Sequence, residues 1–226
     1  MINVEQVEEE RLVAAFNEHV SAREFPCVGA KAAMGRGKLA TLVCNDIASA
    51  WDDMRIHEML LNWSHEYARE PELFRSLAVI FAHSRELSEA EFEHHMWERI
   101  QSLADKDEWR GQTYDHSVSP DPSDPHFGLS FGGQAYFVVG LHASASRLAR
   151  RFERPVLVFN LHDQFEQLRA DQRYERMRET ILKRDVALAG DINPMLARHG
   201  EVSEASQYSG RVVDGEWRCP FRDKRA

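Results

Sequence analysis

One segment of the chain combines a buried strand with a histidine and a group of arginines. In AYFVVGLHASASRLARRFERP (135–155), apolar residues lead to His142, and four arginines follow within twelve residues, Arg147, Arg150, Arg151 and Arg154. Ligand sites are commonly built where strands end in loops, and guanidinium groups bind carboxylates and phosphates bidentately. Haem needs such groups, an imidazole for the iron and guanidinium groups for two propionates. The segment predicts a site for an anionic ligand, although a structural histidine beside a solvated basic loop would look the same.

Three other segments carry groups that could serve such a site. Residues 199–211 (HGEVSEASQYSGR) are dense in hydrogen-bonding side chains, which is typical of a polar pocket wall and also of a surface loop. Residues 160–166 place His162 at a strand-to-helix junction, where Asp163 could simply cap the helix. Cys27 and Cys219 each stand beside a proline. A thiolate can bind haem iron, but buried cysteines are more commonly inert.

The remaining histidines show no metal-binding spacing. His94 and His95 are adjacent, so on a helix they are expected to point in different directions, and His57 and His65 are two turns apart. The sequence contains no HExxH, GxGxxG, GxxxxGK[ST] or GxSxG motif. Metalloprotease, nucleotide-binding and α/β-hydrolase chemistry therefore have no support.

Composition restricts the class of protein further. The 226 residues include 28 Lys and Arg against 37 Asp and Glu, a formal charge of −9, with 3 Cys and no CxxC pair. Affinity for nucleic-acid backbones depends on clustered Lys and Arg, and a disulfide framework or Cys-rich zinc site needs paired cysteines. The N-terminus lacks the basic and apolar regions of a signal peptide, and no apolar run approaches ~20 residues. We expect a cytoplasmic protein without nucleic-acid or membrane partners.

Hydrophobic periodicity predicts the elements that position these residues. Ser88 and Glu91 form a capping box that opens a helix ending near Leu103, and Asp46 is a candidate N-cap for a helix over 47–69. Other helices are expected over 4–19 and, as one or two helices, over 164–189. Strands are expected over 38–43, 77–81, 135–142 and 155–160.

The segments between these elements complete the expected organisation. Residues 105–133 hold several Pro and Gly turns and predict a long loop, and residues 143–154 form a basic connection between two strands. Helices and strands are mixed along the chain, without internal repeats. The sequence therefore predicts a single α+β (or α/β) domain over residues 1–226, with a mixed β-sheet covered by helices.

Five stretches of this sequence resemble the YqcI/YcgG family and occur in the family's order. They are FPCVGAKAAMGRG, YFVVGLHASASRLARRF, NLHDQFEQLR, NPMLARHGEVSEASQYSGR and WRCPF, and they span residues 25–221. Some members of that family look like haem-dependent N-hydroxylases of arginine and other guanidino compounds. Ala143 and Leu161 stand where the family usually has proline, and Ala145 stands where serine is common. These departures lie beside the candidate site and leave the substrate open.

The resemblance implies haem b as the cofactor and suggests where it would bind in this chain. We expect His142 to be the axial ligand of the iron, and the alternatives are His199, His162 and Cys27. The propionates would pair with arginines. The expected cofactor-binding residues are Arg147, Arg150, Arg151, Ser146, Gln207 and Tyr208.

The resemblance also implies a reaction and its partners. Recognition of a guanidinium group needs carboxylates, and Glu201 and Glu204 are the nearest candidates for this catalytic role. The leading hypothesis is a monooxygenase that hydroxylates nitrogen on an arginine-like guanidino or amino compound, using an electron donor or peroxide. The alternatives are a non-enzymatic haem-binding sensor or carrier, and a protein of the same fold that has lost haem and binds another anion. A homodimer is compatible with each hypothesis.

Overall fold

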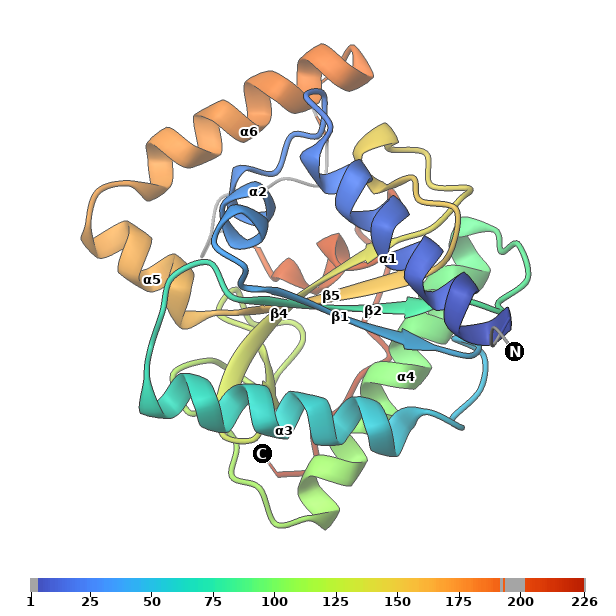
Figure 1. Ribbon diagram of the computed structural model, residues 1–226. Helices are drawn as coiled ribbons and strands as arrows, with labels where there is room; N and C mark the ends of the chain where they lie inside the picture. The colour runs from blue at the N-terminus through green and yellow to red at the C-terminus, as the bar shows by residue number, and fades with distance from the viewer. Residues whose placement is uncertain (1–3, 192, 194–201, 226) are drawn as a thin grey trace.

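A mixed five-stranded sheet lies at the centre of the residues that the computed structural model describes, which are 4–191, 193 and 202–225 (Figure 1). Its strands are β1 (Leu39–Cys44), β2 (Ser76–Phe81), β3 (Leu129–Phe131), β4 (Gln134–Leu141) and β5 (Val156–Leu161). Their order across the sheet is β1-β2-β5-β4-β3, in which β1 and β2 are parallel and the other neighbours are antiparallel. The predicted α+β domain with a mixed sheet is confirmed.

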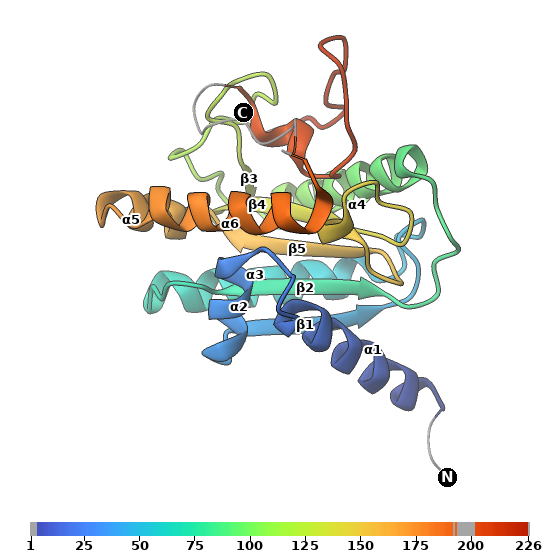
Figure 2. The ribbon, with the colours of Figure 1, turned by 90° about the horizontal axis from the view of Figure 1, so that it is seen from above.

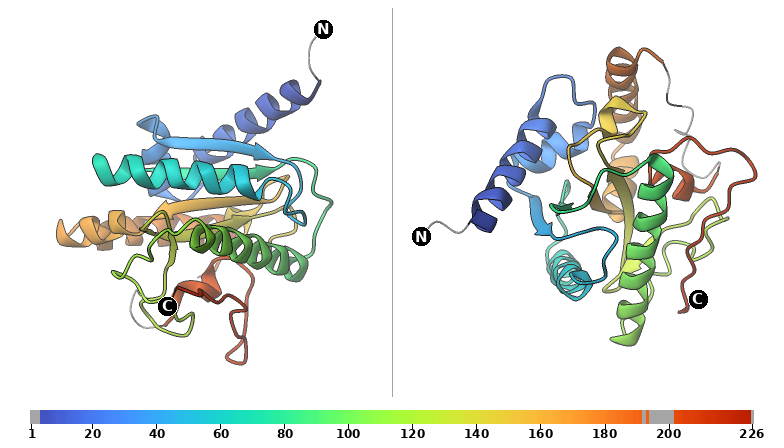
Figure 3. Two further views of the ribbon diagram at one scale, coloured as in Figure 1. Left: turned by 90° about the horizontal axis from the view of Figure 1, so that it is seen from below. Right: turned by 90° about the vertical axis from the view of Figure 1, so that its right-hand side faces the viewer.

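Helices cover both faces of this sheet (Figures 1 and 3). One face, called here the α1 face, carries α1 (Val4–Ser21), α2 (Val28–Gly35) and α6 (Tyr174–Ala189). The other, called the α4 face, carries α3 (Asp53–Arg69) and α4 (Glu89–Trp109). α5 (Asp163–Ala170) links β5 to α6, and two short 3-10 helices, η1 (Leu148–Arg150) and η2 (Glu204–Gln207), lie in connecting segments.

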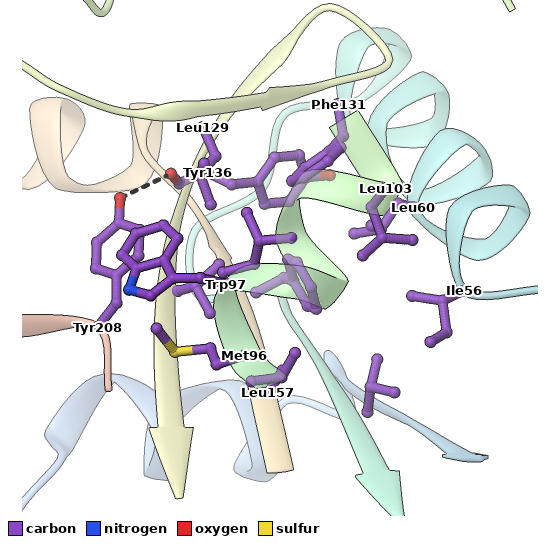
Figure 4. Packing of buried hydrophobic residues seen from close by; sticks show 14 of the residues in the cluster. Ile56, Leu60, Met96, Trp97, Leu103, Leu129, Phe131, Tyr136, Leu157 and Tyr208 are labelled. Carbon is purple, nitrogen blue, oxygen red and sulfur yellow. Dashed lines mark hydrogen bonds between the residues drawn. The ribbon is translucent and has the colours of Figure 1, made fainter. Parts of the chain in front are cut away.

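Side-chain alternation along the strands divides the core between these faces. Tyr136 of β4 and Leu157 of β5 pack with Trp97 of α4 in the larger cluster (Figure 4). Leu141 and Val158, from the same two strands, pack instead in the cluster that includes α1. Successive strand residues point to opposite faces of a sheet. Each strand therefore contributes side chains to both faces of the sheet, and the candidate site described below lies on the α1 face.

The C-terminal segment crosses the α4 face and completes its core (Figure 2). Tyr208 stacks on Trp97 with ring centroids 5.6 Å apart. Arg225 donates to the carboxylate of Asp107 in α4 at 2.5 Å and to the backbone carbonyl of Ser130 in β3 at 2.8 Å. The end of the described chain is thus held by buried contacts to two elements that lie far away in sequence.

Most of the predicted elements are confirmed. All four predicted strands are present, with each end within one residue of the prediction, and the segment 164–189 forms two helices. The capping box is present: the side chain of Ser88 accepts the backbone N–H of Glu91, whose carboxylate accepts the backbone N–H of Ser88. The helix that it opens continues to Trp109 rather than ending near Leu103.

The prediction of a helix N-cap at Asp46 is wrong. The helix begins only at Asp53, and the carboxylate of Asp46 accepts the N–H of Ala48 at 3.1 Å and the hydroxyl of Ser84 at 2.8 Å. A short acidic side chain can close a turn of this kind as readily as it caps a helix. Residues 45–52 therefore form a connection rather than the first turns of α3.

The sequence prediction also misses α2 and β3. α2 has eight residues, mostly Ala and Gly, and β3 has three, so neither gives a strong periodic signal. The loop expected over 105–133 is shorter in the structure and covers residues 110–128. Helix α4 continues to Trp109, and strand β3 begins at Leu129. None of the described helices combines the length and apolar character that a bilayer span requires.

Candidate ligand-binding cavity

The α1 face holds a cavity of about 290 Å³, near the lower end of the ~300–1,000 Å³ usual for small-molecule sites. Its floor is formed by β4 and β5, through side chains such as Val139 and Val158. Its walls come from α1, α5, α6 and the segment that leads into α2. Apolar side chains dominate these walls, among them Phe16, Phe25, Phe74, Leu168, Met177 and Ile181. The cavity therefore suits a ligand with a large apolar surface.

Cys27 lies on the cavity wall at the N-terminus of α2. Its backbone is extended, and its sulfur accepts the backbone N–H of Ala30 at 3.4 Å, so the thiol acts as the N-cap of the helix. Burial raises the pKa of the Cys27 thiol, while the N–H groups of Ala30 and Gly29 and the charge of Arg150 act in the opposite direction. The site thus offers a sulfur donor whose thiolate form has hydrogen bonds and a nearby cation to stabilise it.

Arg150 lies on the same wall without a carboxylate partner. Its guanidinium donates to the backbone carbonyls of Gly140 at 3.0 Å, Tyr208 at 3.1 Å and Gln207 at 3.0 Å. Burial lowers the pKa of this guanidinium to about 10, which leaves it charged at neutral pH. Arg150 therefore contributes a positive potential to the cavity while it joins β4 to the segment of η2.

Arg147 lies on the cavity wall and joins the η1 region to α6. Its guanidinium donates to the buried carboxylate of Asp185 at 2.6 Å, to the carboxylate of Asp191, and to the backbone carbonyl of Asp191 at 2.8 Å. Two carboxylates thus neutralise Arg147. This contact connects the helix that covers the cavity to the loop beyond β4.

Polar side chains gather where β5 passes into α5. His162, 6% exposed, lies on the cavity wall together with Asn160 and Gln164. The amide oxygen of Asn160 accepts the hydroxyl of Ser76 at 2.7 Å, and Gln164 exchanges hydrogen bonds with the backbone of Arg75. These contacts hold the side chains of Asn160 and Gln164, which lie on either side of His162 in the sequence.

The C-terminal segment supplies further polar groups to the cavity. Glu204 and Gln207, both in η2, lie on its wall. Glu201 and His199, the other predicted residues of this segment, lie outside the described residues. Among the described residues, Glu204 and Asp185 are the carboxylates on the cavity wall.

His142 does not lie on the cavity wall. It directly follows Leu141, which lines the cavity, and therefore points to the α4 face, where its ring stacks on Phe92 with centroids 4.3 Å apart. Gly140 permits this approach, because a Cβ there would lie only 2.6 Å from the Phe92 ring. Burial lowers the pKa of His142 to about 4, and its Nδ1 has no hydrogen-bond partner among the described residues. The imidazole is therefore neutral and packed in the core.

Three of the predicted cofactor-binding residues lie away from the cavity, whereas the other three line it. Arg151 donates to the carbonyl of Ala145 at 2.6 Å, and the backbone N–H of Ser146 donates to Glu89 at 2.8 Å. The ring of Tyr208 lies in the core of the α4 face, so only its backbone carbonyl meets the cavity residue Arg150. A run of basic residues along a loop does not reveal which members turn inward.

Sequence reasoning misses the contribution of α6. Met177, Arg178 and Ile181 of this helix line the cavity, and Arg169 of α5 lies beside them. Their apolar spacing predicts a helix face, but nothing in the spacing shows that the face covers a cavity instead of a filled core. The available signal is an arginine within that apolar face, at position 178.

A second group of possible metal ligands lies on the exposed side of α4. His94, His95 and Glu98 place one ligand atom each within 4.8 Å of one another. The nearest contacts are 2.9 Å from His95 to Glu98 and 3.4 Å from His94 to Glu98. The expectation that the adjacent histidines point in different directions is therefore wrong, because both imidazole rings contact the carboxylate of Glu98. None of the three residues lines the cavity.

The comparison with known families covers nearly all of this structure. The model of the YqcI/YcgG family matches residues 16–222, from within α1 to the C-terminal segment. The chain belongs to the YqcI/YcgG family. No curated protein and no solved structure gave a match. The cavity described above is built within the region of this YqcI/YcgG-family protein that the family model matches.

Proposed function

We propose that this YqcI/YcgG-family protein is a haem-dependent monooxygenase that hydroxylates a nitrogen atom of a small guanidino or amino substrate. The observation that carries the proposal is the cavity on the α1 face, which combines apolar walls with a thiol, an imidazole and guanidinium groups. Haem b calls for this combination: apolar surroundings for the macrocycle, a ligand for the iron and cations for two propionates. The residues of the cavity therefore fit the group.

Within this proposal, Cys27 would bind the haem iron, and His162 is the alternative. Both lie on the cavity wall, whereas His142 lies on the opposite face of the sheet. Burial raises the pKa of the Cys27 thiol, and the N–H of Ala30 and the charge of Arg150 act against that rise. A thiolate ligand increases electron density at haem iron and favours cleavage of an O–O bond. This chemistry suits transfer of oxygen to nitrogen.

The chain's own groups would bind and orient the substrate. Glu204 lies on the cavity wall and supplies a carboxylate for a guanidinium or ammonium group. The apolar side chains exclude water, which strengthens such a charged contact inside the cavity. Holding the nitrogen in one position relative to the cofactor is the main task that falls to the protein. Glu201 stays a prediction for the same role.

The proposed reaction balances with either of two oxidants. With hydrogen peroxide, R–NH2 and H2O2 give R–NHOH and H2O. With dioxygen, R–NH2, O2, two electrons and two protons give the same products, so a separate electron donor is required. When bound, haem would supply the activation of the oxidant that side chains do not provide. The proposal includes a cytoplasmic location, which accords with three free cysteines in the chain.

Absorption spectroscopy and product analysis test the proposal in two steps. Protein purified from haem-supplemented cells, or mixed with hemin, is expected to show a Soret band. The loaded protein is then incubated with L-arginine and with a panel of guanidines and amines, plus peroxide or a reductant under air. Mass spectrometry is expected to find a product that has gained one oxygen atom on nitrogen.

The outcomes separate the proposal from its alternatives. A Soret band without a hydroxylated product across the panel would favour a haem-binding sensor or carrier. Absence of any Soret band, with no change on adding hemin, would reject haem chemistry for this cavity. The matched control for product formation is free hemin at the same concentration, which must yield no product under these conditions.

A further inference from the structure

Arg178 occupies an unusual position on α6. The residues of this helix that line the cavity fall on one face, at Tyr174, Met177, Arg178, Ile181, Leu182 and Asp185. Spacings of three and four residues place side chains on the same side of a helix. Arg178 is therefore a cation in the middle of a mainly apolar face that covers the cavity, and it is only partly exposed.

The other arginines on the cavity wall each have hydrogen-bond or ion-pair partners in the protein. Arg147 is paired with two carboxylates, and Arg150 donates to three backbone carbonyls. Arg169 pairs with Glu166 and also lies over the ring of Tyr174, at 4.5 Å from its centroid. Each of these guanidinium groups already has acceptors within the described part of the chain, and Nε of Arg147 is the one buried donor among them without a partner there.

Arg178 differs from these arginines because it has no hydrogen bond or ion pair with any described residue. Placing a guanidinium against apolar side chains without a partner is unfavourable, because the charge loses part of its hydration. A carboxylate is the complementary group, since it accepts two parallel hydrogen bonds from guanidinium. The cost of placing Arg178 here would be offset when a ligand brings such a group into the cavity.

We propose that Arg178 binds the carboxylate of the ligand that occupies this cavity. The inference rests on the proposed function for the identity of that ligand, which offers two carboxylates: a haem propionate and the α-carboxylate of an amino-acid substrate. Their chemistry toward Arg178 is the same. The arginines after β4, which the sequence identifies, mostly bind carbonyl and carboxylate groups of the protein itself. Among the described residues of the cavity wall, Arg178 of α6 is therefore the arginine that is available to bind an anion.

The first experiment compares hemin with hemin dimethyl ester, in which both propionates are blocked. If Arg178 binds a haem propionate, Arg178→Gln weakens hemin binding about tenfold or more, as loss of a charge-assisted hydrogen bond does. The same substitution should leave the affinity for the dimethyl ester unchanged. Arg176→Gln is the matched control, because Arg176 lies on the same helix, is exposed and does not line the cavity. Thermal unfolding of both variants checks that they fold like the wild type.

The second experiment examines the substrate carboxylate in the hemin-loaded protein. L-Arginine and agmatine, which lacks the carboxylate, are titrated while the Soret band is monitored. If Arg178 binds the substrate, Arg178→Gln weakens L-arginine binding about tenfold and agmatine binding little, with hemin affinity unchanged. A selective loss in either experiment supports the proposal and identifies the source of the carboxylate. Equal affinities of wild type and variant for both hemin and L-arginine would overturn it.

The design separates failure of this inference from failure of the proposed function. If the wild type does not bind hemin, the proposed function falls, and metal-free protoporphyrin IX with its dimethyl ester then tests Arg178 by tryptophan fluorescence quenching. Weaker binding of the free acid alone to Arg178→Gln would still support the carboxylate site. If the wild type binds neither porphyrin nor L-arginine, both proposals are rejected.

Discussion

Among single residues, His142 and His162 show that the environment of a side chain depends on which face of the sheet it points to. Each directly follows a strand, β4 or β5. His142 packs against Phe92 on the α4 face, whereas His162 lies on the cavity wall. The two residues have the same type and the same place relative to a strand, but opposite orientation. The environment of each imidazole, and hence the chemistry open to it, follows from that orientation.

The neutral state of His142 makes stability depend on pH. Its pKa is lowered to about 4 in the fold, from 6.5 in an exposed state. Between these values the unfolded chain binds more protons than the folded one, so stability falls as pH falls through this window. The contribution lost between about pH 7 and about pH 5 is about 2 kcal/mol.

Urea unfolding at these two pH values, with wild type and His142→Phe, measures that contribution. The variant keeps a ring against Phe92 and removes the titrating group, so it should lose about 2 kcal/mol less than wild type on acidification. An equal loss in both proteins would contradict a buried neutral His142. Because His142 does not line the cavity, His142→Phe is also expected to retain wild-type affinity for hemin.

Substitution of Cys27 tests the proposed axial ligand. Cys27→Ala is expected to remove the thiolate character of the hemin complex, seen as loss of the red-shifted band of the reduced carbon-monoxide form. His162→Ala should keep that band. Cys219→Ala is the matched control, because Cys219 also neighbours a proline but does not line the cavity. The opposite result, with the band dependent on His162 or unaffected by Cys27→Ala, would exclude Cys27 as the ligand.

At the level of elements, α6 is held differently from the other long helices. The buried residue in this helix is Asp185, whereas α4 buries nine residues. The ribbon in Figure 1 shows α6 as the outermost element above the α1 face. A helix with so few buried side chains depends strongly on specific contacts. Its contact with Arg147 joins it to the loop after β4.

Removal of this contact should loosen α6 without unfolding the domain. Arg147→Ala leaves the carboxylate of Asp185, 5% exposed, without its cation, which is destabilising for a buried group. Amide hydrogen exchange over residues 174–189 is expected to speed up at least tenfold, while protection of α4 stays unchanged. Arg184→Ala, an exposed change on the same helix, serves as control. Uniform acceleration over both helices would instead indicate global destabilisation.

The elements were more predictable from sequence than the site that they build. Strands such as β4 have continuous apolar runs, and the capping box of Ser88 and Glu91 has a fixed spacing, so local chemistry determines both. Which face of β4 borders a cavity depends instead on how α2 and α6 pack, and those helices carry weak or ambiguous patterns. The orientation of His142 and the role of Arg178 therefore needed the three-dimensional arrangement. Of the candidates named from sequence, the residues that line the cavity are Cys27, His162, Glu204, Gln207, Arg147 and Arg150.

On the scale of the whole molecule, one buried carboxylate connects four distant parts of the chain. Asp107 of α4 accepts from Gly132 in the β3–β4 turn at 3.1 Å, contacts His57 Nε2 of α3 at 2.7 Å and pairs with Arg225 near the C-terminus. The side chains of Asp107 and His57 are fully buried, and that of Arg225 is 8% exposed. A single carboxylate therefore connects α3, α4, the β3–β4 turn and the C-terminal segment on the α4 face.

Arg225→Ala should consequently destabilise the whole protein, although it lies at the second-last position. Without this cation the Asp107 carboxylate stays buried with incomplete compensation, which costs about 3–5 kcal/mol when one partner of a buried pair is removed. Lys224→Ala is the matched control: its ion pair with Asp105 is exposed, so the expected loss is about 0–1 kcal/mol. Urea denaturation of the two variants gives the comparison directly. Equal stability of the two variants would mean that Arg225 contributes little to the core. Arg225 and Lys224 are neighbours with the same charge, so the large difference expected between the variants follows from the burial of Arg225 alone.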